Sequence, residues 1–427
     1  MRRCICIMAV LCGFAFLLTQ QAIADDVYKS SSAPTTGKSL TDVLMEKGVI
    51  TKDEAKAIKK DEEKGLNLPK GLQGVSLGGT YFINYFIRNY DSGAKANDNG
   101  FSLDRAYLTL GKEFTPWFST RATVDVTYDK KRGAAGTDAT EVGWEVRIKY
   151  AYGLFDFKNL FGAEVLGDQL RLQSEGGLVH NASDNYDDSL WPYRVEGKNF
   201  LDRHNIMATS DYGANMHLTL GEMDKEFKER VESKYSSRWG GVYFGVYNGS
   251  GFDRSERNDT KFFEGQLWVR PLNMFDWGKG LRLAAQYGNG ESDNKFAIPA
   301  GSKDYPTWNL QMYTASYQHE LFTVFGQYYA GKGTKISTEE KNRTGWDVAG
   351  FVKMPFWPCL RLFAKYDAYT PDDDARQSAD EKTQIYGVSY DLTKGLMVYT
   401  AMERNNYDLK SAGPDTSLYQ MGLKAEF

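Results

Sequence analysis

Basic side chains recur at every second position of several alternating segments in this 427-residue chain, and they have the clearest chemical potential. Rings of basic groups in a water-filled constriction attract anions and lower the barrier to their passage, whereas acidic rings do the same for cations. Asp125, Glu145, Glu264, Asp347 and Asp367 fall at equivalent positions, so the alternative is ion-pair ladders between neighbouring strands that are neutral toward solutes. The residues predicted to line a pore and bind anions are Arg105, Arg121, Arg147, Lys149, Arg171, Arg282, Arg361 and Lys365.

A second charged group lies in the longest polar connection between these segments, Ser174 to Arg203. If this loop folds inward, it narrows the lumen and sets a constriction of mixed charge. If it folds outward, it only covers the mouth. We expect the inward arrangement. The residues predicted to form the constriction are Glu175, Asp184, Asp187, Asp188, Arg194, Lys198 and Arg203.

Patterns typical of catalysis or metal binding are scarce. His180, His204, His217 and His319 have neither the i, i+4 spacing nor the clustering of a metal site. No serine stands in the relation to His217 that an outer-membrane phospholipase would need. The sequence also lacks a Cys-x-x-Cys-His haem attachment motif. We therefore predict no enzymatic activity and no cofactor.

The segments that carry these residues read as β-strands with one apolar face. In Phe118 to Asp129, the side chains alternate between an apolar set and a polar set that includes Arg121 and Asp125. Trp144, Val146, Ile148 and Tyr150 alternate in the same way with Glu145, Arg147 and Lys149. An apolar band opposite a polar one suits a wall between lipid and water, and about sixteen such segments follow Val75. The predicted fold is an all-β, antiparallel transmembrane barrel of about sixteen strands.

The connections between these strands alternate in length. Tight links such as Thr115-Pro116 and Leu392 to Gly395 alternate with long polar ones such as Lys130 to Glu141. This pattern is typical of short periplasmic turns and longer outer loops, and it places both ends of the barrel in the periplasm. Glu222 to Ser237 is an exception, because a long charged segment stands where a short turn is due. We expect it to extend the strands or to form a local helix.

The N-terminal region predicts export from the cytoplasm. Arg2 and Arg3, an apolar stretch and Ala22-Ile23-Ala24 form a secretory signal, residues 1–24, cleaved between Ala24 and Asp25. Its removal changes the net charge from −4 to −6, which gives no reason to expect nucleic acid as a partner. Residues 25–74 are predicted to be a periplasmic linker and a helical segment, Ser39 to Gly65, with a capping box at Thr51 to Glu54. Residues 75–427 are the barrel, which we expect in the outer membrane, in contact with its lipid.

Several ordered motifs resemble the phosphate-selective porin O and P family. They are Phe101 to Leu110, Trp117, Leu190 to Arg194, Phe200 to Asp202, Ser210 to Gly213 and Tyr243 to Gly251. The resemblance covers most of residues 75–427 and implies a sixteen-stranded, trimeric, passive diffusion channel, often for anions such as phosphate. The arginine ladder and the extracellular lysine cluster of the phosphate channels have no clear counterpart here, so fold transfers more safely than substrate. The terminal strand, which ends on Phe427, also resembles the signal read by the barrel-assembly machinery of the outer membrane.

Two alternative functions remain open from the sequence. The barrel would be a sheath for a separate multihaem cytochrome if its lumen were wide and free of a constricting loop. It would be a structural tether to the envelope, through Ser39 to Gly65, if it conducted no solute. A porin for small anionic solutes is the interpretation we favour.

Overall fold

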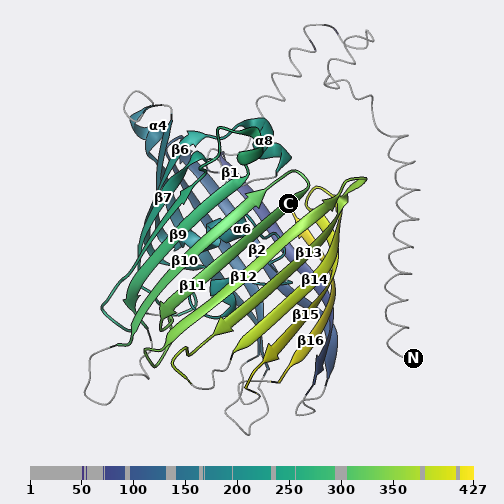
Figure 1. Ribbon diagram of the computed structural model, residues 1–427. Coiled ribbons are helices and arrows are strands. Elements are labelled where there is room, and N and C mark those ends of the chain that lie inside the picture. Colours follow the sequence, from purple (N-terminus) through teal and green to yellow (C-terminus); the bar gives the residue numbers. More distant parts are fainter. Residues whose placement is uncertain are drawn as a thin grey trace. The chain divides into compact units, whose positions relative to one another are not determined.

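Sixteen antiparallel strands form one closed sheet in the computed structural model, which confirms the predicted fold (Figure 1). The structure describes Thr51, Glu54, Gly71 and residues 73–91, 97–130, 141–162, 167, 169–194, 196–231, 237–254, 256–293, 305–375, 380–409 and 414–427. The predicted signal peptide lies outside the described residues, and so does the helical segment apart from Thr51 and Glu54. Those two residues form the expected capping box, in which Thr51 N donates to Glu54 Oε2 (2.7 Å) and Glu54 N donates to Thr51 Oγ1 (3.2 Å).

Each strand pairs with its neighbours in sequence, and β1 pairs with β16 to close the ring. Because the ring closes, every strand of the sheet has a paired neighbour on each side, as a sheet in lipid requires. The strands are β1 (Val75–Tyr90), β2 (Asp98–Thr115), β3 (Phe118–Lys130), β4 (Glu141–Asp156), β5 (Leu170–His180), β6 (Ser210–Glu222), β7 (Ser237–Tyr247), β8 (Phe262–Val269), β9 (Leu281–Glu291), β10 (Thr307–Gln318), β11 (Phe322–Lys332), β12 (Asn342–Met354), β13 (Trp357–Thr370), β14 (Glu381–Thr393), β15 (Leu396–Tyr407) and β16 (Thr416–Glu426).

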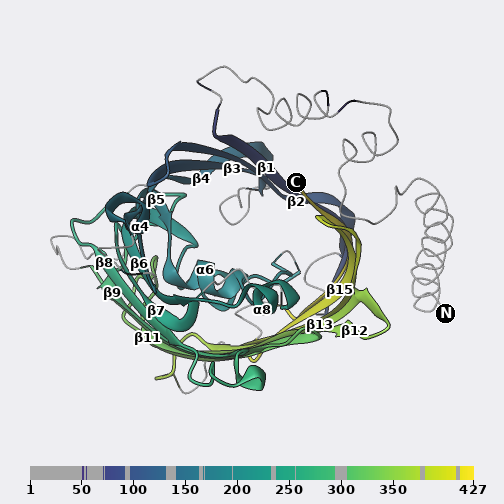
Figure 2. The same cartoon turned by 90° about the horizontal axis from the view of Figure 1, so that it is seen from above.

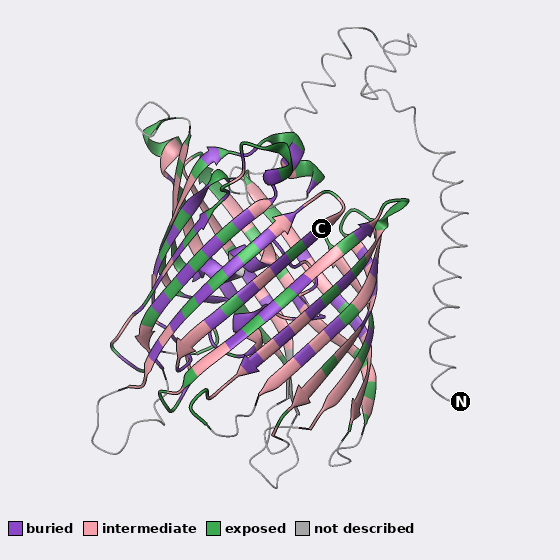
Figure 3. Cartoon of the chain, in the orientation of Figure 1, coloured by how far each residue is buried: buried purple, intermediate pink, exposed green. Residues whose placement is uncertain are grey.

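Exposed and buried residues alternate along most strands, as Figure 3 shows. On β9, Leu283 and Tyr287 are exposed on the outer face, whereas Arg282 and Gln286 are buried inside. The outward set is apolar, which suits contact with lipid. No helix among the described residues is long and apolar enough to cross a membrane.

The expected outward position of Tyr150 is wrong. Trp144, Val146 and Ile148 do point outward, with 56%, 71% and 55% exposure, but Lys149 and Tyr150 are both only 4% exposed. The register between β3 and β4 shifts at this point, because Ile148 pairs with Val124 and Tyr150 pairs with Thr123. This β-bulge sends two successive side chains into the lumen.

Strict alternation of connection length also fails, because three connections on the side of the barrel where short turns are predicted contain a helix or a 3-10 helix, and Glu222 to Ser237, the exception already expected, is one of them. Residues 157–169 contain α4 (Phe157–Phe161), residues 223–236 contain α8 (Lys225–Arg230), and residues 270–280 contain the 3-10 helix η2 (Asp276–Gly278). In the exceptional segment Glu222 to Ser237, the local helix is the arrangement found. Asp224 caps α8 by accepting from Phe227 N at 3.0 Å, and Met223, Phe227 and Val231 are buried together.

Candidate functional site

The longest loop, residues 181–209, lies inside the barrel. Figure 2 shows its helix α6 (Ala182–Asp188) within the ring of strands. The loop is shorter than predicted, because Ser174 to His180 belong to β5 and Glu175 is therefore a wall residue. Ala182 N donates to Glu264 Oε2 of β8 (3.0 Å), and Tyr193 shares a hydrogen bond of 2.9 Å with Ser389 of β14. Of the two arrangements considered from the sequence, this is the inward one.

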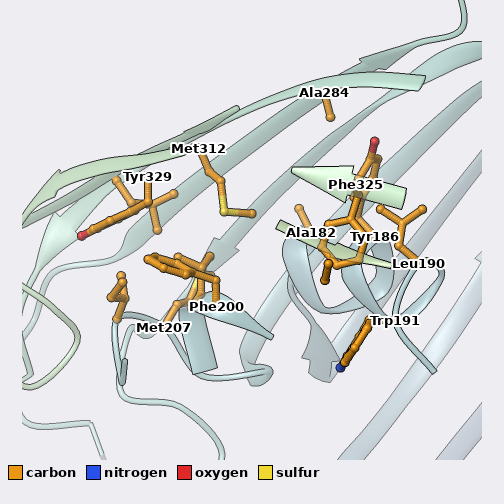
Figure 4. Packing of buried hydrophobic residues seen from close by; sticks show 14 of the residues in the cluster. Ala182, Tyr186, Leu190, Trp191, Phe200, Met207, Ala284, Met312, Phe325 and Tyr329 are labelled. Carbon is orange, nitrogen blue, oxygen red and sulfur yellow. The ribbon is translucent and has the colours of Figure 1, made fainter. Parts of the chain in front are cut away.

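Apolar packing holds the loop against one side of the wall (Figure 4). Tyr186, Leu190, Trp191 and Phe200 of the loop are each at most 3% exposed, and they share one buried cluster with strand residues such as Met312, Phe325 and Tyr329. A large apolar side chain gains about 1.5–3 kcal/mol when it is fully buried. The summed gain opposes the entropy cost of ordering a long loop.

Buried ion pairs anchor the end of the loop at α7 (Phe200–Arg203). Arg203 contacts Glu403 on β15 (3.1 Å) and Asp367 on β13 (3.2 Å). Burial alone would lower the pKa of Arg203, but these two carboxylates raise it above its ordinary value. Lys365 lies between Asp347 (3.2 Å) and Asp367 (3.3 Å) and donates to the backbone oxygen of Lys198 (2.9 Å).

Asp187 is a second anchor, and its role depends on its protonation state. Its side chain is buried and accepts from Gln327 Nε2 of β11 at 2.7 Å. Burial, and then the nearby charge of Asp347, raise the pKa of Asp187 to about 8. The group is therefore mainly protonated at neutral pH and adds little negative charge to the lumen.

Arg105, Arg121 and Lys149 lie on the wall formed by β2, β3 and β4, and each contacts an aromatic side chain. Arg105 Nη1 donates to the Tyr107 hydroxyl (2.7 Å). Lys149 Nζ lies 4.8 Å from the Tyr107 ring centre, and the Arg121 guanidinium lies 5.1 Å from that of Tyr150. Within the described part of the chain, none of the three forms a salt bridge to a carboxylate.

A cavity of about 1200 Å³ separates this wall from the loop. Besides the three wall cations, the loop contributes Asp188, Trp191 and Arg194 to the lining. Arg194 contacts Asp188 (2.8 Å) and Asp202 (3.6 Å), so part of its charge is balanced. The cationic side chains among the described lining residues are Arg105, Arg121, Lys149, Arg194, Arg361, Lys394 and Lys424, whereas the carboxylate side chains are Asp188 and Glu426.

Asp202 of α7 is outside the described cavity lining but close enough to interact electrostatically with the wall cations Arg105 and Lys149. Burial would raise the pKa of Asp202, but Lys198, Arg194, Arg105 and Lys149 together hold it below the ordinary value of an aspartate. Burial lowers the pKa of Lys198, which pairs with Asp202 at 3.6 Å. Asp202 is therefore an ionised carboxylate that offsets part of the positive charge.

Comparison with known proteins gives structural matches alone, since no family model matches the sequence and no curated protein does. The structure is similar to OmpF of Salmonella typhi, solved in complex with daunomycin (TM-score 0.53, 15% identity, 83% of this chain and 97% of that chain). It is also similar to an anion-selective porin from Comamonas acidovorans (0.53, 10%, 83% and 99%). A third match is a trimer form of OmpT, an outer membrane protein of Vibrio cholerae (0.51, 13%, 83% and 100%).

The chain has the porin fold. Together with the apolar outer face and the closed sheet, this fold places the protein in the outer membrane, as predicted. At these low identities the matches show the fold and nothing finer. The resemblance to the phosphate-selective porin O and P family therefore stays an expectation.

The predicted pore-lining residues of this porin fold fall into two groups. Arg105, Arg121, Lys149 and Arg361 line the cavity, although Arg361 also contacts Asp391 at 2.6 Å. The other four predicted residues are outside the cavity lining, and each contacts a protein group instead. Arg147 pairs with Asp125 (2.8 Å), Arg171 pairs with Asp156 (3.1 Å), Arg282 lies under the loop on the ring of Tyr186 (4.0 Å), and Lys365 is the buried anchor described above.

The predicted constriction residues are also divided. Asp188 and Arg194 line the cavity. Lys198 is not in the lining but forms an ion pair with Asp202. Asp187 and Arg203 are buried residues that anchor the loop. Glu175 is buried in the wall, where Asn215 Nδ2 donates to it at 2.9 Å. The side chain of Asp184 lies outside the described residues.

Sequence reasoning missed Asp202, Tyr107 and Tyr150 as residues of the constriction. Nothing in the sequence signals the bulge that turns Tyr150 inward. A usable signal did exist for the loop itself, because Leu310, Met312 and Phe325 are apolar at lumen-facing positions of β10 and β11. Apolar residues in a polar lumen indicate that another part of the chain covers them.

Proposed function

We propose that this protein is a passive porin whose water-filled channel favours small anionic solutes. The observation that carries the proposal is the charge of the cavity lining, in which, among the described residues, seven cationic side chains stand against the carboxylate side chains of Asp188 and Glu426. Positive charge in a narrow aqueous passage raises the local concentration of anions and lowers the barrier to their entry.

The expected preference is modest. Arg194, Arg361 and Lys424 each contact a carboxylate within 4 Å, so the wall cations Arg105, Arg121 and Lys149 supply most of the unbalanced charge. Two unit charges 6 Å apart in water interact by only about 0.7 kcal/mol. Salt screens such interactions further, so the preference weakens as ionic strength rises.

The loop position argues against a sheath around a cytochrome. A sheath needs an open lumen, whereas residues 181–209 cross this one and are held by apolar packing and by the Arg203 ion pairs. A purely structural tether gives no reason for a basic passage beside the loop. Diffusion of solutes accounts for both features, and neither chemistry nor a cofactor is required for it.

The decisive experiment is single-channel recording of the purified full-length protein in planar bilayers under a KCl gradient. We expect stable conductance steps and a reversal potential on the anion-selective side, larger at 0.1 M than at 1 M salt because of screening (about 10 Å and 3 Å Debye lengths). Absence of conductance would favour the structural tether. A cation-selective reversal potential would overturn the anion preference.

A further inference from the structure

The lining of the cavity is aromatic as well as basic. Aromatic residues in the lining include Phe82, Tyr107, Tyr150, Trp191, Trp268 and Phe351. An inorganic anion gains nothing from apolar surface, because such surface cannot replace the water of hydration that the ion loses. A solute that carries both a charge and an apolar body can use both parts of the lining.

The basic part is arranged to receive an oxyanion. The Tyr107 hydroxyl accepts from Arg105 Nη1 (2.7 Å) and from Lys149 Nζ (3.5 Å). Both partners are donors only, so neither engages the proton of this hydroxyl. Lys149 Nζ also lies 5.2 Å from the ring centre of Tyr150, over which the Arg121 guanidinium lies at 5.1 Å, so the phenol and the three cations are neighbours in one lining. Hydrogen bonds from such groups to a charged acceptor are the strong ones.

The apolar part comes from the constriction loop. Pro192 is partly exposed in the lining of the same cavity, and it directly follows Leu190 and Trp191, which are only 1% and 3% exposed. Trp191 is fixed, because its Nε1 donates to Gly197 O (2.8 Å) and its ring meets those of Phe325 and Phe363 edge-on. A fixed apolar surface on one side and a basic one on the other match an anion whose charge sits at one end.

We propose that this cavity binds carboxylates that carry a ring or a similarly compact apolar body, in preference to inorganic oxyanions and short hydrophilic carboxylates. This inference rests on the anion-favouring channel proposed above and names its substrate class. The carboxylate is held by Tyr107, Arg105, Arg121 and Lys149, and the ring lies toward Pro192. A volume of about 1200 Å³ admits such a solute together with water.

The test compares solutes that differ in one part only. With chloride as the carrier ion, benzoate, acetate, inorganic phosphate and neutral benzamide are each added, and the concentration that halves the chloride current is measured in planar bilayers. Benzoate and acetate share charge and head group, so their difference isolates the ring. We expect the half-blocking concentration of benzoate to be about tenfold below those of acetate and phosphate, and benzamide to be ineffective.

Three variants assign the effect to the two parts of the site, each after its heat-modifiable mobility has shown that the barrel is folded. Pro192→Asn should lower the preference for benzoate over acetate severalfold, because a polar side chain replaces the apolar surface. Tyr107→Phe should weaken the block by both acids. Lys382→Gln, which removes an exposed charge paired with Asp408 outside the cavity lining, is the control and should keep the preference.

The outcomes separate the two proposals. Equal half-blocking concentrations for benzoate and acetate in an anion-selective channel would overturn the substrate class and leave the proposed function standing. Tighter block by phosphate than by benzoate, or block by benzamide, would also overturn it. A channel without anion preference would remove the proposed function itself.

Discussion

Gly79 and Phe427 close the barrel by exchanging two backbone hydrogen bonds, Gly79 N to Phe427 O and Phe427 N to Gly79 O, each 3.1 Å long. The ring of Phe427 occupies the space beside Gly79, where a Cβ would lie 2.6 Å from the ring carbon Cζ. The same ring stacks on Tyr81 at 6.0 Å between centroids. The last strand is therefore joined to the first both by its backbone and by its terminal ring.

Deletion of Phe427 should lower the yield of folded barrel. It removes two closing hydrogen bonds and the ring contact at the one seam that joins distant parts of the sequence. Heat-modifiable mobility on gels measures the folded fraction. Wild-type yield after this deletion would show that the terminal residue is dispensable for assembly.

Gly79→Val should act through the same contact, because the new side chain displaces the Phe427 ring. Gly100→Ala is the matched control, since its Cβ would lie 3.8 Å from Phe86, which is ordinary contact. We expect the folded fraction to fall for Gly79→Val and to stay unchanged for Gly100→Ala. Equal yields would mean that the ring moves aside at little cost.

Replacement of Arg121 and Lys149 together by Gln should shift the reversal potential toward cations. Each lost charge removes about 0.7 kcal/mol of attraction for an anion at 6 Å in water, so the anion permeability should fall by up to about tenfold at low salt. Replacement of Lys341 and Lys382 together by Gln serves as the control, because it removes two exposed charges that pair with carboxylates outside the cavity lining. An equal shift in both proteins would assign selectivity to the overall charge of the barrel.

Replacement of Arg203 by Gln should loosen the end of the constriction loop. The substitution leaves Asp367 and Glu403 without their shared partner, and removal of one member of a buried ion pair costs about 3–5 kcal/mol. We expect higher single-channel conductance with more open-channel noise. Lys382→Gln removes an exposed pair with Asp408 and should leave conductance unchanged, because such pairs contribute only about 0–1 kcal/mol. Unchanged conductance for Arg203→Gln would mean that the apolar cluster alone holds the loop.

The docking of the loop should weaken as pH rises toward about 8. The pKa of Asp187 is about 8 in the docked loop, whereas that of a free aspartate is about 3.9. Between these two pH values, Asp187 is protonated in the docked loop but ionised in the released loop. Docking is therefore most stable below about pH 4, weakens progressively up to about pH 8, and changes little above it. Ionised Asp187 would face Asp347 and Asp188, with Lys365 as the nearby cation.

The measurement for this prediction is conductance between pH 5 and pH 9. We expect it to rise with pH in the wild type and to be flat for Asp187→Asn, which keeps the shape of the protonated side chain. A rise of the same size in the variant would assign the pH dependence to other groups.

A homotrimer remains a prediction, which rests on the sequence resemblance to the phosphate-selective porin O and P family. Chemical cross-linking of intact outer membranes should give a band at three times the mass of the mature chain. Native mass measurement in mild detergent should give the same ratio. Monomer alone in both experiments would contradict the prediction.

The sequence by itself determined the barrel, its strand number and its two faces. Alternation along β3, β9, β13 and β16 can be read directly, because a side chain's face in a strand depends only on its position along the chain. It also located the loop and most of the basic residues near it, since both follow from composition between strands.

Tertiary structure alone decided which basic residues face open space. Arg121 and Arg147 have the same local pattern, yet Arg121 lines the cavity and Arg147 is paired with Asp125 across the β3–β4 ladder. The inward turn of Tyr150 arises from a register shift between two strands, which no property of either strand specifies. The partner of a charged group and the space in front of it are set by elements distant in sequence, and a single-strand pattern holds no information about them.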